Sequence, residues 1–319
     1  MQKYTFEKRD FSAIDNEVEA FNKIPREGII DNFNRRIDLD YISNSDMIEN
    51  MNSDHDFLLD AIHNQNLKVL RSYPKLFVND PNMKSGEVSD KLFNVNGLDA
   101  DDQNKAYRDY LKNTELVVYD KSTDEEFHIK TTGHLLAVYE VINEARRAKM
   151  LKQSIGHNVD LTAEFIADNV NCHVLGEPFG RYRSPWYYPV IGLKGVDWCI
   201  PGGRRVDEEM ENLLNWYNNE SADLHPLERA AIFHIEFIRI HPFADGNGRT
   251  GRLLVNYELV KNGYPTITIK ATQRGEYLEA INEAVMTGNA TKMVDLLASR
   301  MQSRLRLYNQ ILSEDGQEQ

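Results

Sequence analysis

Two segments in the last third of the chain are apolar around almost their whole circumference when they are wound as helices. They are residues 225–240, HPLERAAIFHIEFIRI, and residues 249–262, RTGRLLVNYELVKN. Pro226 suits the first position of the first helix, and Gly263 ends the second. Because a helix that is apolar on all sides must be buried, we predict two neighbouring core helices joined by residues 241–248.

The composition indicates a globular chain and excludes some partners. The chain has 319 residues, of which 41% are hydrophobic, enough for one large or two smaller domains. A net charge of −13 argues against nucleic acid as the main partner, since phosphate binding needs clustered Lys and Arg. The two cysteines imply no disulfide framework, and no run approaches the roughly 18 apolar residues of a membrane span. We therefore expect a cytoplasmic protein with no membrane partner.

The rest of the chain is expected to be mainly helical. Over residues 10–75, apolar positions such as Ile37, Tyr41 and Ile48 recur at helical spacing, and Pro74 ends the run. The further predicted elements are a polar loop over residues 79–105, helices over residues 131–150 and 161–177, and a β-hairpin over residues 187–200 with Pro189 on an edge strand.

The connection between the two core helices, together with the start of the second helix, contains more charged residues and glycines than a simple turn requires. Arg249 and Arg252 lie three residues apart on the second helix, on one stripe of an otherwise apolar surface, and buried arginines need partners. The Gly246-Asn-Gly start leaves the first helical N–H groups unhindered at the positive end of the helix dipole. The pattern predicts a phosphate site with two guanidinium groups, and Asp245 is placed to hold a divalent cation.

Other interpretations of this connection explain less. A simple turn with Asp245 as a helix cap leaves the two inward arginines unexplained. An EF-hand is excluded because Arg249 would occupy its fifth position, and a Walker loop because no Lys precedes a Ser or Thr. His241 could be a structural histidine, as we expect of His234. Beside an anion site, however, a neutral imidazole could take a proton from an incoming hydroxyl.

Residues 241–252, HPFADGNGRTGR, resemble the signature of the Fic family, H-x-F-x-[D/E]-G-N-G-R-x-x-R, with every specified position filled. The similarity covers about residues 130–300, including LTAEFIADNVNCHVL and Gly180-Arg-Tyr-Arg183. It implies an all-α, mainly helical fold with a Fic-type core and a β-hairpin flap. The implied parts are an N-terminal helical region over residues 1–125, a Fic (Fido) catalytic domain over residues 126–300, and a helix end with an acidic tail over residues 301–319.

The resemblance further implies a protein adenylyltransferase that moves AMP from ATP to a Ser, Thr or Tyr hydroxyl of a protein, this chain itself being one candidate target. His241 would be the general base, Asp245 would hold Mg2+, and Phe243 would anchor the loop. Arg249 and Arg252 would hold the pyrophosphate part of ATP. The residues expected around the nucleotide are Gly246, Asn247, Gly248, Arg249, Gly251 and Arg252, with Asn256 and Tyr277 near the adenine.

A second match suggests inhibition. Ser45-Asp-Met-Ile-Glu49-Asn50 resembles the inhibitory helix of the family, [S/T]-x-x-x-E-[G/N], within about residues 37–51 and before the core, as in class II. Ser45 and Glu49 are four residues apart, so they share a helix face. The resemblance implies that Glu49 pairs with Arg252 and blocks the γ-phosphate. The hairpin over residues 186–200 resembles the flap that holds a target segment as an added strand.

Three other functions stay open on the sequence alone. They are transfer of UMP, GMP or phosphate, removal of AMP by a water that Glu49 positions, and a nucleotide-binding scaffold without turnover. The pair of His241 and Asp245 argues against a pure binder, which has little need of a base. A homodimer is compatible with each of these functions.

Overall fold

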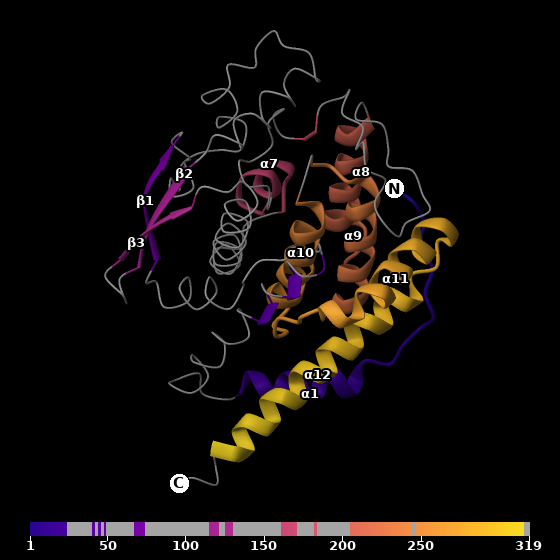
Figure 1. Ribbon diagram of the computed structural model, residues 1–319. Coiled ribbons are helices and arrows are strands. Elements are labelled where there is room, and N and C mark those ends of the chain that lie inside the picture. Colours follow the sequence, from indigo (N-terminus) through magenta and orange to yellow (C-terminus); the bar gives the residue numbers. More distant parts are fainter. Residues whose placement is uncertain are drawn as a thin grey trace.

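Helices dominate the computed structural model (Figure 1). The structure describes residues 1–23, 40–41, 44–45, 48, 67–73, 115–120, 125–129, 161–170, 182–183, 205–243 and 246–315. The mainly helical class predicted from the sequence is confirmed. The predicted loop over residues 79–105, the helix over residues 131–150 and the hairpin over residues 187–200 lie outside the described residues.

The helical body contains the two predicted core helices. Its helices are α8 (Val206–Asn219), α9 (Pro226–Ile240), α10 (Asn247–Lys261), α11 (Arg274–Thr287) and α12 (Thr291–Asp315), with the 3-10 turn η3 (Ala271–Gln273) before α11. Pro226 opens α9, as predicted, after a capping box in which His225 Nδ1 accepts from Leu227 N at 3.2 Å and the Glu228 carboxylate accepts from His225 N at 3.1 Å. Both α9 and α10 are buried over most of their length.

Helices α9 and α10 cross closely at Gly251. A Cβ atom on Gly251 would lie 2.9 Å from Nδ1 of His234 and 3.1 Å from Cδ1 of Ile238. His234 is fully buried and hydrogen-bonds through Nε2 with the Tyr277 hydroxyl at 2.9 Å. Burial lowers the pKa of His234 to about 3, so the ring is neutral and serves as a packing residue. Gly251 is therefore required by helix packing, whatever it contributes to a nucleotide site.

Gly251→Ala is expected to destabilise the fold by about 1–3 kcal/mol, because the added methyl overlaps the His234 ring. The free energy of urea unfolding measures this. Gly275→Ala on α11 is the matched control, since a Cβ atom there meets nothing within 4 Å. The control should be neutral or stabilising, and equal losses in both variants would contradict the packing argument.

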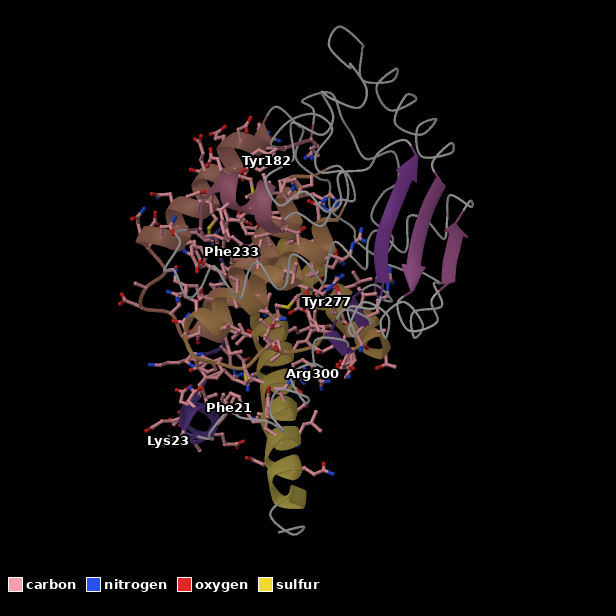
Figure 2. The ribbon with its side chains drawn as sticks, turned by 90° about the vertical axis from the view of Figure 1, so that its left-hand side faces the viewer. Phe21, Lys23, Tyr182, Phe233, Tyr277 and Arg300 are labelled. Carbon is pink, nitrogen blue, oxygen red and sulfur yellow. The ribbon has the colours of Figure 1, made fainter. Side chains whose placement is uncertain are left out.

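A three-stranded antiparallel sheet lies beside the helical body in both ribbon views (Figure 1, Figure 2). Its strands are β1 (Leu67–Tyr73), β2 (Glu115–Asp120) and β3 (Glu125–Ile129), in the order β1-β2-β3 and with a register shift between Val69 and Arg71. The prediction of helix through residues 67–73 is wrong. Pairing with β2, which lies far along the chain, overrides the weak local preference.

The N-terminal segment packs onto the helical body. Helix α1 (Ser12–Asn22) lies across α12, and the Phe21 and Tyr308 rings are 4.4 Å apart (Figure 2). Thr5 and Asn289 form an isolated parallel β-bridge between the N-terminal segment and the turn before α12. Helix α12 runs unbroken past residue 300, so the predicted end of the catalytic domain falls inside a helix.

The predicted helix over residues 161–177 is helical where it is described. Thr162 caps α7 (Ala163–Phe165), accepting from Phe165 N at 3.1 Å, and the chain continues as a π-helix, η1 (Ile166–Val170). None of the helices that the structure describes is both long and apolar enough to cross a bilayer.

Candidate active site

Two of the described residues in the connection between α9 and α10 have left-handed backbone. His241 ends α9 with φ 52° and ψ 60°, and Gly246 precedes α10 with φ 77°. The Asn247 side chain closes the turn, because its Nδ2 donates to Phe243 O at 2.8 Å and its Oδ1 accepts from Phe243 N at 2.9 Å. The Phe243 side chain is fully buried, as expected of a loop anchor. Asp245 lies outside the described residues.

The first turn of α10 is suited to an anion. Gly246 has no side chain to cap the helix, so the N–H groups of the first turn stand at the positive end of the helix dipole. Gly246 O instead accepts the first intrahelical bond, from Thr250 N at 2.9 Å. A phosphate oxygen is the kind of ligand that such a helix start binds.

Arg249 and Arg252 are both buried, with 2% and 3% of their surface exposed. The Arg252 guanidinium donates from Nε to Ser45 Oγ at 3.0 Å and from Nη2 to Ser45 O at 2.8 Å. Its Cζ lies 5.9 Å from the centre of the Tyr277 ring. The structure thus joins the helix start, both arginines and Ser45, which are far apart in the sequence.

The described residues of the segment predicted to be inhibitory, which are residues 40, 41, 44, 45 and 48, are helical and dock beside η3 and α11. Lys270 Nζ lies 2.6 Å from Asp40 Oδ1, and Ala271 N donates to Asn44 Oδ1 at 2.9 Å. Arg274 Nε donates to Ile48 O at 2.7 Å. No local sequence pattern predicts these contacts, because each joins residues more than 220 positions apart.

Tyr41 and Ile48 are buried, at 6% and 3% exposure, as expected if they attach this segment to the core. Glu49 lies outside the described residues. In a continuous helix, its position four residues after Ser45 would set it on the same face as the residue that Arg252 binds. The pairing of Glu49 with Arg252 remains a prediction.

The two residues expected near the adenine have structural partners. The Asn256 amide donates to Ile267 O at 3.1 Å and accepts from Ile267 N at 2.8 Å, so it ties α10 to the chain before η3. Tyr277 hydrogen-bonds with His234 and stacks beside Arg252. These contacts account for both polar side chains without a nucleotide, and their approach to an adenine remains a prediction.

The described residues therefore define a helical protein in which two buried arginines lie on the helix that follows the His241 turn, an arrangement suited to a phosphate-containing ligand. Residues 157–259 match the model of the Fic/DOC family. Over 285 residues the chain is 29% identical to protein adenylyltransferase Fic of Drosophila melanogaster, an alignment that covers 86% of this chain and 51% of that protein. It is 35% identical over 104 residues to protein adenylyltransferase fic-1 of Caenorhabditis elegans, covering 32% of this chain and 20% of that protein. The chain thus spans about half the length of the Drosophila relatives.

Solved structures agree on the fold. A Fic domain containing signaling protein from Bacteroides thetaiotaomicron superposes with a TM-score of 0.62 at 20% identity, covering 93% of this chain and 94% of that chain. Fic-1 from C. elegans superposes with a TM-score of 0.58 at 16% identity, covering 96% and 72%. Residues 157–259 thus form a domain of the Fic/DOC family, and the likeness to solved structures extends the fold over most of the chain.

Proposed function

We propose that the chain is a self-inhibited protein adenylyltransferase that transfers AMP from ATP to a Ser, Thr or Tyr hydroxyl of a protein. The observation that carries the proposal is the burial of Arg249 and Arg252 in the first turns of α10. This helix has no side-chain cap at Gly246, and it follows the loop that begins at His241. Guanidinium groups held out of water bind carboxylates or phosphates, and beside an anion-binding helix start a polyphosphate can engage both of them. The similar Drosophila and C. elegans proteins are named protein adenylyltransferases.

In this proposal His241 is the general base. The target hydroxyl gives its proton to the imidazole as its oxygen attacks the α-phosphorus of ATP, and the bond from that phosphorus to the bridging oxygen of the β-phosphate breaks. Pyrophosphate leaves with the electron pair. Such in-line transfer needs mainly positioning and charge neutralisation, which the α10 N–H groups, Arg249 and Arg252 supply.

Asp245 would hold Mg2+ against the phosphates, and the ion would neutralise charge that develops on the leaving pyrophosphate. Within the described ranges no three His, Cys, Asp or Glu side chains form a metal cluster. A single carboxylate still fits the chemistry, because Mg2+ is commonly bound through one or two carboxylates together with substrate phosphates.

Inhibition would act through Arg252. Ser45 occupies two of its donors, and a Glu49 carboxylate on the same helix face would pair with it and repel the γ-phosphate. Two unit charges about 4 Å apart interact by roughly 4 kcal/mol at an effective dielectric of 20. We also propose that residues 186–200 receive the target segment as an added strand. A homodimer and a cytoplasmic location remain predictions.

The proposal is tested by incubating the chain and its Glu49→Gly variant with α-phosphate-labelled ATP and Mg2+. Label should appear on the chain or on an added protein, and it should be stronger with the variant. Labelled GTP and UTP in the same assay, and a target modified beforehand, separate AMP transfer from other transfers and from AMP removal. ATP binding without protein labelling in either form would instead indicate a scaffold.

Arg274→Met is expected to relieve inhibition in the otherwise unchanged chain. It removes the charged hydrogen bond to Ile48 O, and a net loss of about 1.5 kcal/mol would raise the undocked fraction of the segment about tenfold. The initial labelling rate measures the change. Lys292→Met is the matched control, since it removes a surface cation that pairs with Glu279 and Glu283 on α11. An unchanged rate in Arg274→Met would show that this contact does not hold the segment.

A further inference from the structure

One buried arginine binds the backbone on which His241 sits. Arg183 is 2% exposed, and its Nε donates to His241 O at 2.7 Å. Its Nη2 donates to Ile240 O at 3.4 Å, and its backbone N–H donates to Pro242 O at 2.8 Å. Three consecutive carbonyls around the end of α9 are therefore bound by a single residue from a distant part of the sequence.

These carbonyls need such a partner for two reasons. The last C=O groups of a helix have no intrahelical donor, and here the helix end is buried. His241 also has a left-handed backbone conformation, with φ 52°. A residue other than glycine rarely adopts this conformation unless its surroundings stabilise it. A guanidinium satisfies both needs, since its hydrogen bonds are charge-assisted and its fork reaches two carbonyls at once.

The neighbouring residue supports the same loop from its apolar side. Tyr182 is buried, and its ring lies 6.0 Å from that of Phe243, the fully buried residue two positions after His241 (Figure 2 labels Tyr182). Residues 182 and 183 thus hold the loop both through its backbone carbonyls and through its anchoring side chain. The start of α10 is held separately, by the Asn247 side chain on Phe243.

We infer that Arg183 is a positioning residue, which fixes the backbone of His241 so that the imidazole stands over the phosphate site. The inference rests on the proposed function, in which His241 is the base. ATP binding and proton transfer would then depend on different residues, because the groups proposed to hold ATP belong to α10 whereas Arg183 binds the end of α9. Loss of Arg183 should therefore impair the proton transfer and leave ATP binding nearly intact.

The kinetic test uses the Glu49→Gly background. Arg183→Met should lower kcat by about 100-fold, the scale expected for a displacement of roughly 1 Å in a catalytic group. KM for ATP should change little, and Arg183→Lys should recover part of kcat, because an ammonium can bind one of the carbonyls. Arg304→Met is the control, since Arg304 is 6% exposed and its Nη2 donates to Thr268 Oγ1 at 2.9 Å. It should lower stability without lowering kcat.

A spectroscopic test does not depend on turnover. In a 15N spectrum of the histidine side chains, the His241 signals are those lost in His241→Asn. They should shift or broaden in Arg183→Met and in Arg183→Lys, and stay in place in Arg304→Met. Unchanged His241 signals together with an unchanged kcat would overturn the inference. If the Glu49→Gly chain transfers no AMP at all, the proposed function fails, and the spectrum alone decides whether Arg183 positions His241.

Discussion

His241→Asn is expected to lower the rate of AMP transfer by about 10²- to 10⁴-fold, the usual contribution of a general base. Asparagine is the informative substitution because His241 has φ 52°, a left-handed conformation that Asn tolerates better than Ala does. The variant therefore removes the base and keeps the backbone of the turn. Initial rates of protein labelling in the Glu49→Gly background measure the loss.

ATP affinity provides the control for this prediction. The proposed anion site lies on α10, so His241→Asn should bind an ATP analogue with nearly the affinity of its parent, as calorimetry can establish. Loss of transfer together with loss of binding would indicate a collapsed turn. Transfer at the parental rate would show that the imidazole is not the base.

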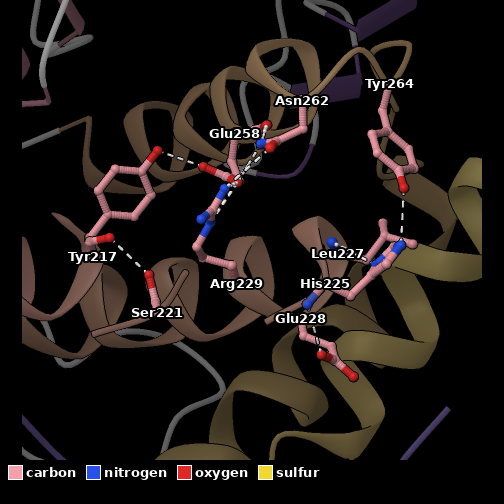
Figure 3. A network of polar contacts seen from close by, with 9 residues as sticks. All are labelled: Tyr217, Ser221, His225, Leu227, Glu228, Arg229, Glu258, Asn262 and Tyr264. Atoms are coloured by element: carbon pink, nitrogen blue, oxygen red, sulfur yellow. Dashed lines mark hydrogen bonds and ion pairs between the residues drawn. The ribbon is translucent and has the colours of Figure 1, made fainter. Parts of the chain in front are cut away.

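Glu258→Ala is expected to destabilise the protein by about 3–5 kcal/mol, because it removes a buried carboxylate that binds both the partly buried Arg229 guanidinium and the Tyr217 hydroxyl. Glu258 is 2% exposed on α10 and joins three helices (Figure 3). Its carboxylate accepts from the Tyr217 hydroxyl of α8 at 2.5 Å and from Arg229 Nε of α9 at 2.6 Å. The Asn262 amide donates to it as well, at 2.6 Å.

The free energy of urea unfolding measures this effect, and two further variants interpret it. Glu258→Gln keeps the shape and the acceptor for Tyr217, so it should cost less than Glu258→Ala. Glu279→Ala removes a carboxylate that is 66% exposed and pairs with Lys292, and it should change the stability little. If Glu258→Ala lowered the free energy of unfolding no more than Glu279→Ala does, water or another group would be satisfying the Arg229 guanidinium.

Tyr217 reports on the same network. Burial, together with the neighbouring Glu258 carboxylate, raises the pKa of the Tyr217 hydroxyl far above its ordinary value. The hydroxyl therefore stays protonated and donates to Glu258 throughout the physiological range. Helices α8, α9 and α10 are thus joined by one buried carboxylate, near the C-terminal end of α10 and away from the proposed phosphate site at its start.

The sequence by itself predicted the elements whose information is local. Helices α9 and α10 follow from apolar residues at every turn, with Pro226 at the start of the first. Glycines and arginines at fixed spacing in one short segment likewise predict a phosphate site. Both arginines are buried, as that spacing required. Local periodicity and helix-end chemistry need no knowledge of distant residues.

Only the tertiary structure decided the contacts that join distant segments. It made residues 67–73 a strand, since β1 has its partner in β2. It brought Ser45 within hydrogen-bonding distance of Arg252, and it paired the Asn256 amide with the backbone of Ile267. It also brought Arg183 to the carbonyls of α9. The physical reason is that a buried polar group must form a hydrogen bond with a group that lies next to it in the folded chain. Which group lies there depends on the fold and not on sequence spacing.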